Sequence, residues 1–336
     1  MVRRIRRLLP GLLALVAIGL AARTVASVVP SANYLIVTIV IGIVVANTYG
    51  VPSWTQPGVG THTVWLETGI VVMGASVALD RVLAAGPRIL LLVVSTVLAT
   101  LVVVEVLARA VFAIHEETGS LLAAGSSICG VSAVVAIAES IDADETRIAY
   151  AAATVLLFDA ATLFVYPLVG HALQLSDTVF GIWAGLTMFS TGPVTAAGFA
   201  FSEAAGEWAL LVKLTRNALI GLAAIGYALH YARRTEGSGA AESVAGGATH
   251  LWATFPKFVL GFLGVMLVAN LGLLGDSAIT SLSHAADWAF MLAFAGLGLE
   301  IDVDELRSTG YRPVLVVLVG LVVVSTTVLL VVNGLF

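Results

Sequence analysis

The chain has 336 residues, of which 59% are hydrophobic and 11% charged, and its mean hydropathy is +1.03. A soluble globular domain carries about 25% charged residues, so this chain has too few to cover a water-exposed surface. The composition therefore excludes soluble, disordered and nucleic-acid-binding proteins. With a single cysteine the chain has no disulfide framework, and the net charge of −5 is too small to indicate a partner.

Long apolar segments recur along the whole chain. Because a helix needs roughly 20 apolar residues to cross a bilayer, we predict an all-α polytopic membrane protein with about 10–11 transmembrane helices. The predicted spans lie near residues 8–29, 33–48, 63–80, 88–112, 120–138, 147–170, 180–201, 207–231, 251–274, 281–299 and 312–335.

Basic residues are distributed unequally between the two sides of the predicted membrane. If the N-terminus is cytoplasmic, most of the loop arginines and lysines lie on the cytoplasmic side, as the positive-inside rule requires. They include Arg3, Arg4, Arg6, Arg7, Arg109, Lys257 and Arg312. We therefore expect a multi-pass protein of the cell (inner) membrane with a cytoplasmic N-terminus.

A polar segment rich in glycine, alanine and serine, residues 233–250, is typical of a linker. It divides the chain into an N-terminal transmembrane bundle (1–232), a cytoplasmic linker (233–250) and C-terminal transmembrane segments (251–336). All three form one integral membrane domain in this interpretation.

Two segments match at a fixed offset of 224 residues: one begins at Met73-Gly74 and the other at Leu297-Gly298. In each, an apolar span is followed by an amphipathic elbow, a glycine, an arginine and a new span. The first copy closes an odd-numbered span and the second an even-numbered one, so the copies run in opposite directions. Such inverted repeats are typical of secondary transporters, which bind substrate near the membrane midplane. Chance recurrence of glycine and leucine is the alternative.

Two runs of small and polar residues predict breaks inside membrane-spanning helices. Irregular backbone at that depth must be buried in protein or line a cavity, and a helix N-terminus exposed there attracts anions. Ser190 or Thr191 can cap a helix that has Pro193 in its first turn. Close helix packing is the alternative role of such residues. The predicted substrate-binding residues are Gly125, Ser126, Ser127, Cys129, Gly130 and Ser132 in the run 124–133, and Ser190, Thr191 and Gly192 in the run 189–198.

Charged residues within the spans are further candidates, because a charge at the bilayer centre costs about 2.5–3.5 kcal/mol. Asp159, near the middle of the sixth span, and Glu67 are candidates for ion or proton coupling; a structural hydrogen bond is the alternative for Asp159. Lys213 and Arg216 share one helix face and are expected to bind the substrate or to pair with a carboxylate. Snorkelling is the alternative for Lys213.

Motifs for catalysis or nucleotide binding are missing from the sequence. It has no His-Glu-x-x-His zinc site, no Gly-x-Ser-x-Gly nucleophile elbow and no phosphate-binding loop. We therefore expect no enzyme activity, no catalytic residue, no metal and no cofactor. The energy for transport must come from a gradient or a partner.

The segment 125–130, Gly-Ser-Ser-Ile-Cys-Gly, follows Leu-Leu-Ala-Ala and resembles the hallmark of the YeiH family of sulfate exporters. Supporting matches follow in order along nearly the whole chain, among them Tyr166-Pro167, Lys213 with Arg216, and Pro256-Lys257-Phe258. The resemblance implies an inner-membrane protein related in fold to bile-acid/sodium symporters and sodium/proton antiporters. It also implies inverted repeats and crossed, discontinuous helices.

The sequence departs from that family at several ionisable positions. Relatives carry a histidine–acid pair and a glutamine where this chain has Phe189, Ser190 and Pro193. Glu67 and Asp159 stand where a basic or small residue is expected. The main-chain site thus resembles the family pattern, while its ionisable groups are rearranged.

Together these features predict a secondary transporter that exports sulfate or a related small sulfur-containing anion. Its partners would be the anion, Na⁺ or H⁺, the lipid bilayer and a second copy in a homodimer, with no nucleic acid. A cation/proton antiporter using Asp159 is the alternative, and an intramembrane enzyme is a weaker one.

Overall fold

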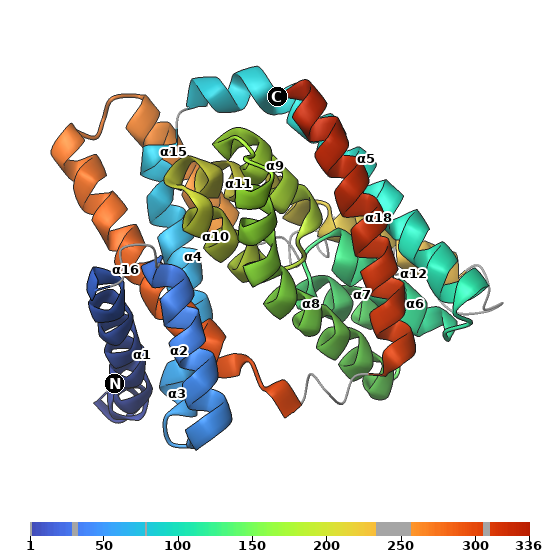
Figure 1. Cartoon of the computed structure of the whole chain (residues 1–336), viewed down its shortest axis with the longest axis horizontal. Helices are drawn as coiled ribbons and strands as arrows, with labels where there is room; N and C mark the ends of the chain where they lie inside the picture. The colour runs from blue at the N-terminus through green and yellow to red at the C-terminus, as the bar shows by residue number, and fades with distance from the viewer. Residues whose placement is uncertain (1, 29–32, 78, 233–256, 305–309) are drawn as a thin grey trace. The chain divides into compact units, whose positions relative to one another are not determined.

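The computed structural model describes residues 2–28, 33–77, 79–232, 257–304 and 310–336, and every regular element in these ranges is a helix (Figure 1). This confirms the prediction of an all-α polytopic membrane protein. Three shorter apolar helices cover Tyr34–Tyr49, Val131–Ile141 and Phe258–Asn270. Within the described ranges, six helices are long and apolar enough to cross a membrane: Arg7–Val28, Gly86–Val111, Glu145–Ala172, Glu203–Tyr231, Asp276–Glu300 and Tyr311–Leu335.

The chain forms two compact units, each built from two separate stretches of sequence. Unit 1 comprises Met1–Gly86 and Lys257–Val303, and unit 2 comprises Pro87–Pro256 and Asp304–Phe336. The two units therefore differ from the division that the sequence suggested at residues 233–250. The predicted linker itself lies outside the described residues.

Unit 1 is assembled around α16, which packs against α4 and α2. Its glycines allow close approach of the helix backbones: a Cβ added at Gly42 would lie 2.9 Å from the Ala295 carbonyl oxygen. Small residues at such contacts are how membrane helices pack tightly. The elements of this unit are α1 (Val2–Val28), α2 (Tyr34–Tyr49), α3 (Gln56–Val59), α4 (His62–Met73), the 3₁₀ turn η1 (Gly74–Ser76), α15 (Phe258–Asn270) and α16 (Asp276–Glu300).

Two asparagine side chains bind the main chain at equivalent points in unit 1. Val77, after η1, and Ile301, after α16, stand 224 positions apart, and both have extended backbone (ψ 123° and 101°). Asn270 Nδ2 donates to the Val77 carbonyl oxygen over 2.8 Å. Asn47 Nδ2 donates to the Ile301 carbonyl oxygen over 2.7 Å. The two acceptors are therefore separated by the offset of 224 residues found in the sequence, and the two donors by 223.

Unit 2 contains two pairs of short consecutive helices separated by brief breaks, one between α6 and α7 and one between α9 and α10 (Figure 1). Helix α11 packs along α9 and α10, and α8 packs along α6 and α10. Helix α5 (Leu79–Val106) belongs to unit 2 only from Pro87 onward. The other elements of unit 2 are the π-helical turn η2 (Leu107–Val111), α6 (Glu116–Ser127), α7 (Val131–Ile141), α8 (Glu145–Ala172), α9 (Asp177–Thr187), α10 (Thr191–Phe201), α11 (Glu203–Asn217), α12 (Ile220–Ala232) and α18 (Tyr311–Leu335).

Candidate functional site

The first break follows the C-terminus of α6, inside the predicted run 124–133. Ile128 leaves helical geometry (φ −115°, ψ −80°), and Gly130 adopts φ +69° and ψ −137°. Only glycine adopts such a conformation without strain. Gly130 is therefore the residue that permits the chain to turn before α7 begins at Val131.

The second break follows α9, inside the predicted run 189–198. Met188 and Ser190 are both extended (ψ 154°), and Ser190 is the N-cap of α10. Pro193 lies in the first turn of α10, where a missing N–H costs no hydrogen bond. A helix with Pro193 in its first turn begins here as predicted, and Ser190 holds the N-cap position, but its side chain makes no capping hydrogen bond.

The two breaks are in contact with each other. A Cβ added at Gly130 would overlap the hydroxyl oxygen of Ser190. Glycine is therefore required at position 130 both for its backbone conformation and for this close approach. The two breaks thus meet at Gly130 and Ser190, and we refer to the residues around this contact as the crossing site.

Arg216 of α11 joins the C-terminal ends of α6 and α9. The side chain is 1% exposed, and it donates five hydrogen bonds of 2.8–3.3 Å to main-chain carbonyl oxygens. A guanidinium group has five N–H donors, so all of them are used. The last carbonyls of a helix lack partners within it and carry partial negative charge, which a cation stabilises. The acceptors belong to Ser126, Ser127, Gly185 and Met188.

Lys213 lies one helical turn before Arg216 and is fully buried. Its Nζ donates to the carbonyl oxygens of Ile128 (2.7 Å) and Phe189, and more weakly to that of Met188 (3.4 Å). The ammonium group thus bridges the two breaks and does not reach the surface. Among the described residues, neither cation lies within 4 Å of a carboxylate oxygen.

Asp159 of α8 places the opposite charge at the start of α10. Its Oδ1 accepts a hydrogen bond from the main-chain N–H of Ser190 over 2.9 Å, where the helix dipole stabilises a negative charge. We expected this helix N-terminus to be open to an external anion, but an internal carboxylate occupies it. The other oxygen, Oδ2, is buried and has no hydrogen-bond partner among the described residues.

The remaining predicted residues differ in their surroundings. Ser126 has a buried hydroxyl without a partner among the described residues, whereas Ser132 is exposed on α7. Glu67 is exposed on α4 of unit 1, while Asp159 belongs to unit 2. Thr191 is partly exposed, and its Oγ1 accepts a hydrogen bond from Asn217 over 3.0 Å. The buried residues near the breaks are Gly125, Ser127, Cys129, Gly130 and Gly192.

A polar network beside the crossing site was not found by sequence analysis. The Tyr166 hydroxyl lies 3.0 Å from Thr187 Oγ1 and 2.9 Å from Ser325 Oγ. Trp183 Nε1 donates to Ser325 Oγ over 3.0 Å, and its ring stacks on that of Tyr166. The four-residue spacing of Trp183 and Thr187 on an otherwise apolar helix was the available signal.

A small cavity lies beside the crossing site. A cavity of about 10 Å³ lies among Ser126, Thr187 and Ser325. A water molecule needs at least roughly 10–15 Å³, so this space admits no more than one water. Binding of a larger molecule in this cavity requires the helices to move apart.

The chain is similar to one family of proteins along nearly its whole length. The family model described as "Conserved hypothetical protein 698" matches residues 10–317. A UPF0324 membrane protein of Nitratidesulfovibrio vulgaris is 33% identical over 317 residues, which cover 92% of this chain and 88% of the relative. UPF0324 membrane proteins of Bacillus cereus (31% over 294 residues; 87% and 81%) and Vibrio vulnificus (30% over 290 residues; 86% and 89%) are also similar. No solved structure matches the chain significantly. This multi-pass membrane protein therefore belongs to the family of conserved hypothetical protein 698, and UPF0324 membrane proteins are its relatives.

Proposed function

We propose that this protein is a secondary transporter and that the crossing site is its transport site. The observation that carries the proposal is the meeting of two broken helices around buried Asp159, Lys213 and Arg216. Broken helices at membrane depth are tolerated where protein or a cavity surrounds them, and transporters use their ends to bind substrates and ions.

A small anion is the substrate that the charges of the site favour. Two helix C-termini and two helix N-termini contribute partial charges of about −0.5 and +0.5 each, which cancel. With Lys213, Arg216 and Asp159 ionised, one positive charge remains. A buried charge is costly unless it is paired, so a bound anion offsets this excess. Sulfate, the substrate that the family resemblance implies, is our first candidate.

Arg216 is assigned a positioning role in this proposal. All its donors are used by main-chain carbonyls, so it holds α6 and α9 together instead of contacting the anion. Direct ligands must come from groups that have donors to spare. The Ser126 hydroxyl is the first such group, because it is buried without a partner among the described residues.

Asp159 is the proposed coupling group. Its Oδ2 can accept a proton or a sodium ion while Oδ1 keeps its hydrogen bond from Ser190. Protonation adds one positive charge to the site, so proton and anion bind together and cross in the same direction. Export then requires an outward anion gradient that exceeds the opposing proton gradient.

Uptake of radiolabelled sulfate into proteoliposomes tests both parts of this proposal. We expect uptake to accelerate as the external pH falls, and Asp159→Asn to transport without that pH dependence. Asp177→Asn, in the exposed first turn of α9, is the matched control and should behave as wild type. Absence of transport of sulfate, sulfite and alkyl sulfonates would refute an anion substrate. A persistent pH dependence in Asp159→Asn would refute the coupling role.

A cation/proton antiporter is the second candidate function. It is favoured by the saturation of Arg216 and Lys213 with main-chain acceptors, which leaves neither cation a spare donor for an anion. The test is cation-induced dissipation of a preset pH gradient in vesicles without a transportable anion. Proton release on addition of Na⁺, K⁺ or Li⁺ that disappears in Asp159→Asn would support the antiporter and overturn the anion proposal.

A further inference from the structure

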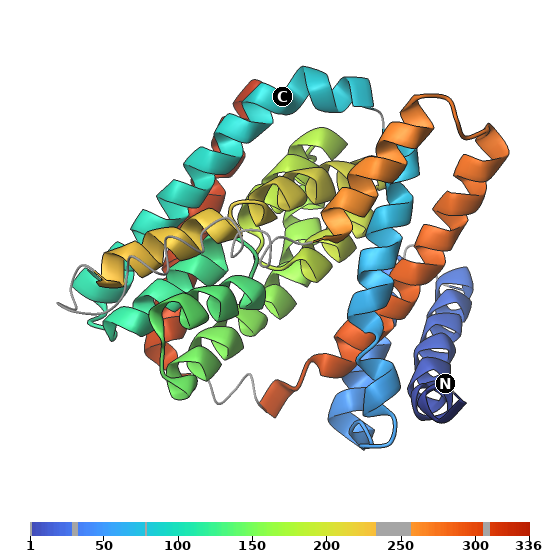
Figure 2. The same ribbon diagram turned by 180° about the vertical axis from the view of Figure 1, so that it is seen from behind.

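Hydrogen bonds to one serine hold helix α18 against α8 and α9. Ser325 Oγ of α18 lies 2.9 Å from the Tyr166 hydroxyl of α8, and Trp183 Nε1 of α9 donates to the same oxygen over 3.0 Å. All three side chains are buried. Helix α18 also runs beside α5, as both views show (Figures 1 and 2). An indole N–H and a phenol O–H therefore meet at one neutral oxygen in the interior of unit 2.

Neither of these donors is committed to a single acceptor. The one proton of the Tyr166 hydroxyl has two neighbouring oxygens, Ser325 Oγ and Thr187 Oγ1 (3.0 Å). The N–H of Trp183 is shared between Oγ and the main-chain oxygen of Ser325 (3.1 Å). Hydrogen bonds to a charged acceptor are roughly twice as strong as those between neutral groups. Both donors would therefore form stronger bonds if they turned from Ser325 to the oxygen of an anion.

Ser126 contributes a third donor, which has nothing to bind. Its hydroxyl is buried and has no partner among the described residues. By contrast, the hydroxyl of the neighbouring Ser127 donates back to the Ala124 carbonyl oxygen over 3.2 Å, as serine often does within a helix. Ser126 and Ser325 line the same cavity of about 10 Å³. A buried polar group without a partner is costly, so a ligand that enters this cavity gains a hydrogen bond from Ser126.

The cavity adjoins the positive charges of the crossing site. Phe189, in the second break, lines the cavity, and Lys213 Nζ donates to the carbonyl oxygen of that residue. Arg216 donates to the carbonyl oxygen of Ser126 (3.3 Å). The two cations thus stand behind the cavity wall, while neutral O–H and N–H groups face inward or lie beside it. Fixed neutral donors of this kind stabilise oxyanions in protein interiors.

We propose that Ser126, Tyr166 and Trp183 are the direct ligands of the transported anion, and that Ser325 takes the position of one anion oxygen in the conformation described here. This inference rests on the proposed function. Three donors from three helices suit an anion with several oxygens on one centre, such as sulfate or a sulfonate, better than a halide. The cavity admits at most one water, so α18 must separate from α9 before the anion enters. Binding then replaces the contacts to Ser325 with stronger ones to the anion.

Equilibrium binding of radiolabelled sulfate to the purified full-length protein in detergent tests these assignments. We expect Ser126→Ala, Tyr166→Phe and Trp183→Phe each to weaken binding by at least about tenfold, the contribution of one hydrogen bond to a charged group. Unlabelled methanesulfonate should displace the bound sulfate at lower concentration than chloride does.

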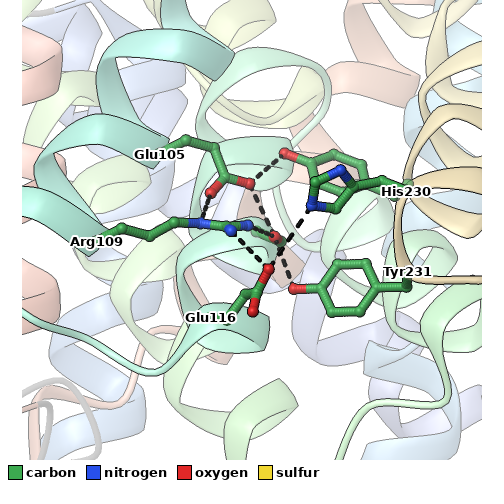
Figure 3. Close-up of polar contacts among 7 residues, drawn as sticks. Glu105, Arg109, Glu116, His230 and Tyr231 are labelled. Carbon is green, nitrogen blue, oxygen red and sulfur yellow. Dashed lines mark hydrogen bonds and ion pairs between the residues drawn. The ribbon is translucent and has the colours of Figure 1, made fainter. Parts of the chain in front are cut away.

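Two substitutions of the same kind serve as matched controls. The Tyr231 hydroxyl also contacts a serine hydroxyl, that of Ser120 at 3.1 Å, but in a charged cluster whose residues do not line the cavity (Figure 3). Trp65 belongs to α4 of unit 1, and its Nε1 is buried without a partner among the described residues. Tyr231→Phe and Trp65→Phe should therefore bind sulfate within about twofold of wild type.

Ser325→Ala should give a result that a purely structural role would not produce. Loss of the hydroxyl removes the group with which the anion competes, so sulfate should bind about fivefold more tightly, the contribution of one neutral hydrogen bond. A serine that only supports the fold would leave the affinity unchanged or lower it. Thr327→Val, on the exposed face of α18, is the control and should bind as wild type.

The outcomes separate this inference from the proposed function. A wild-type protein that binds neither sulfate nor a sulfonate would overturn both. Sulfate binding that withstands Tyr166→Phe and Trp183→Phe would leave anion transport standing and overturn these ligands. Weaker binding by Ser325→Ala would overturn the competition between Ser325 and the anion. If Trp183→Phe does not fold, Ser126→Ala and Ser325→Ala still decide, because their affinities should shift in opposite directions.

Discussion

Replacement of Gly130 by alanine tests the crossing of the two broken helices most directly. The added Cβ would overlap the Ser190 hydroxyl oxygen, and the backbone at position 130 has a positive φ. To remove the overlap, Ser190 must move, although its N–H is hydrogen-bonded to Asp159. The substitution therefore strains the first break and disturbs the second.

The expected cost has two parts. A non-glycine residue in this region of backbone space costs about 1–3 kcal/mol. Weakening the buried hydrogen bond from Ser190 to the Asp159 carboxylate costs a further ~1.5–3 kcal/mol. We therefore expect Gly130→Ala to reduce the free energy of unfolding by about 2.5–6 kcal/mol, a large share of the 5–15 kcal/mol typical of folded proteins.

Thermal unfolding of the purified protein in detergent measures this effect. Gly226→Ala is the control, because its Cβ meets open space in a helix and should stabilise by up to about 1 kcal/mol. Combining Gly130→Ala with Ser190→Ala removes the hydroxyl, so residue 190 need not move and its N–H keeps its hydrogen bond to Asp159. The double mutant should therefore recover the hydrogen-bond part of the cost, a coupling of about 1.5–3 kcal/mol in a double-mutant cycle. A Gly130→Ala protein within about 0.5 kcal/mol of wild type would refute the reasoning.

Two further substitutions test side chains that form hydrogen bonds with distant main-chain groups. Arg216→Met leaves carbonyls at two helix ends without donors, so it should destabilise the protein by more than about 3 kcal/mol, against at most ~0.5 kcal/mol for exposed Arg312→Met. Equal melting temperatures for these two variants would contradict the positioning role. Asn47→Ala removes hydrogen bonds to Ile301 and Val303 and should cost about 1–3 kcal/mol. Thermal unfolding measures both, and an unchanged stability of Asn47→Ala would show that this contact is dispensable.

Much of the architecture follows from local properties of the chain. Apolar segments of membrane-spanning length predicted an all-α polytopic protein, and the described helices agree with that prediction. The two breaks were predicted at the correct places, because glycine at position 130 and proline at position 193 alter backbone preferences within one or two residues. The grouping of Lys257–Val303 with the N-terminal helices was not predicted, because it depends on packing between α16 and α4.

The contacts of the charged residues in the crossing site could not be predicted from local sequence. The spacing of Lys213 and Arg216 predicted one shared helix face, but not that their partners would be carbonyl oxygens 85 to 90 positions before them and at the end of α9. Asp159 was predicted as a candidate because a charge within an apolar span costs free energy. Its contact with the N-terminus of α10 was not predicted.

By itself, the sequence determined that this chain crosses a membrane, where its helices break and which charged residues stand in apolar segments. Helix length and the backbone conformation at glycine and proline depend mainly on residues close in sequence, so they can be predicted from local patterns. The tertiary structure alone decided what each buried charge contacts. Helix ends from distant parts of the chain supply those partners, and only packing brings α6, α9 and α10 to the same place.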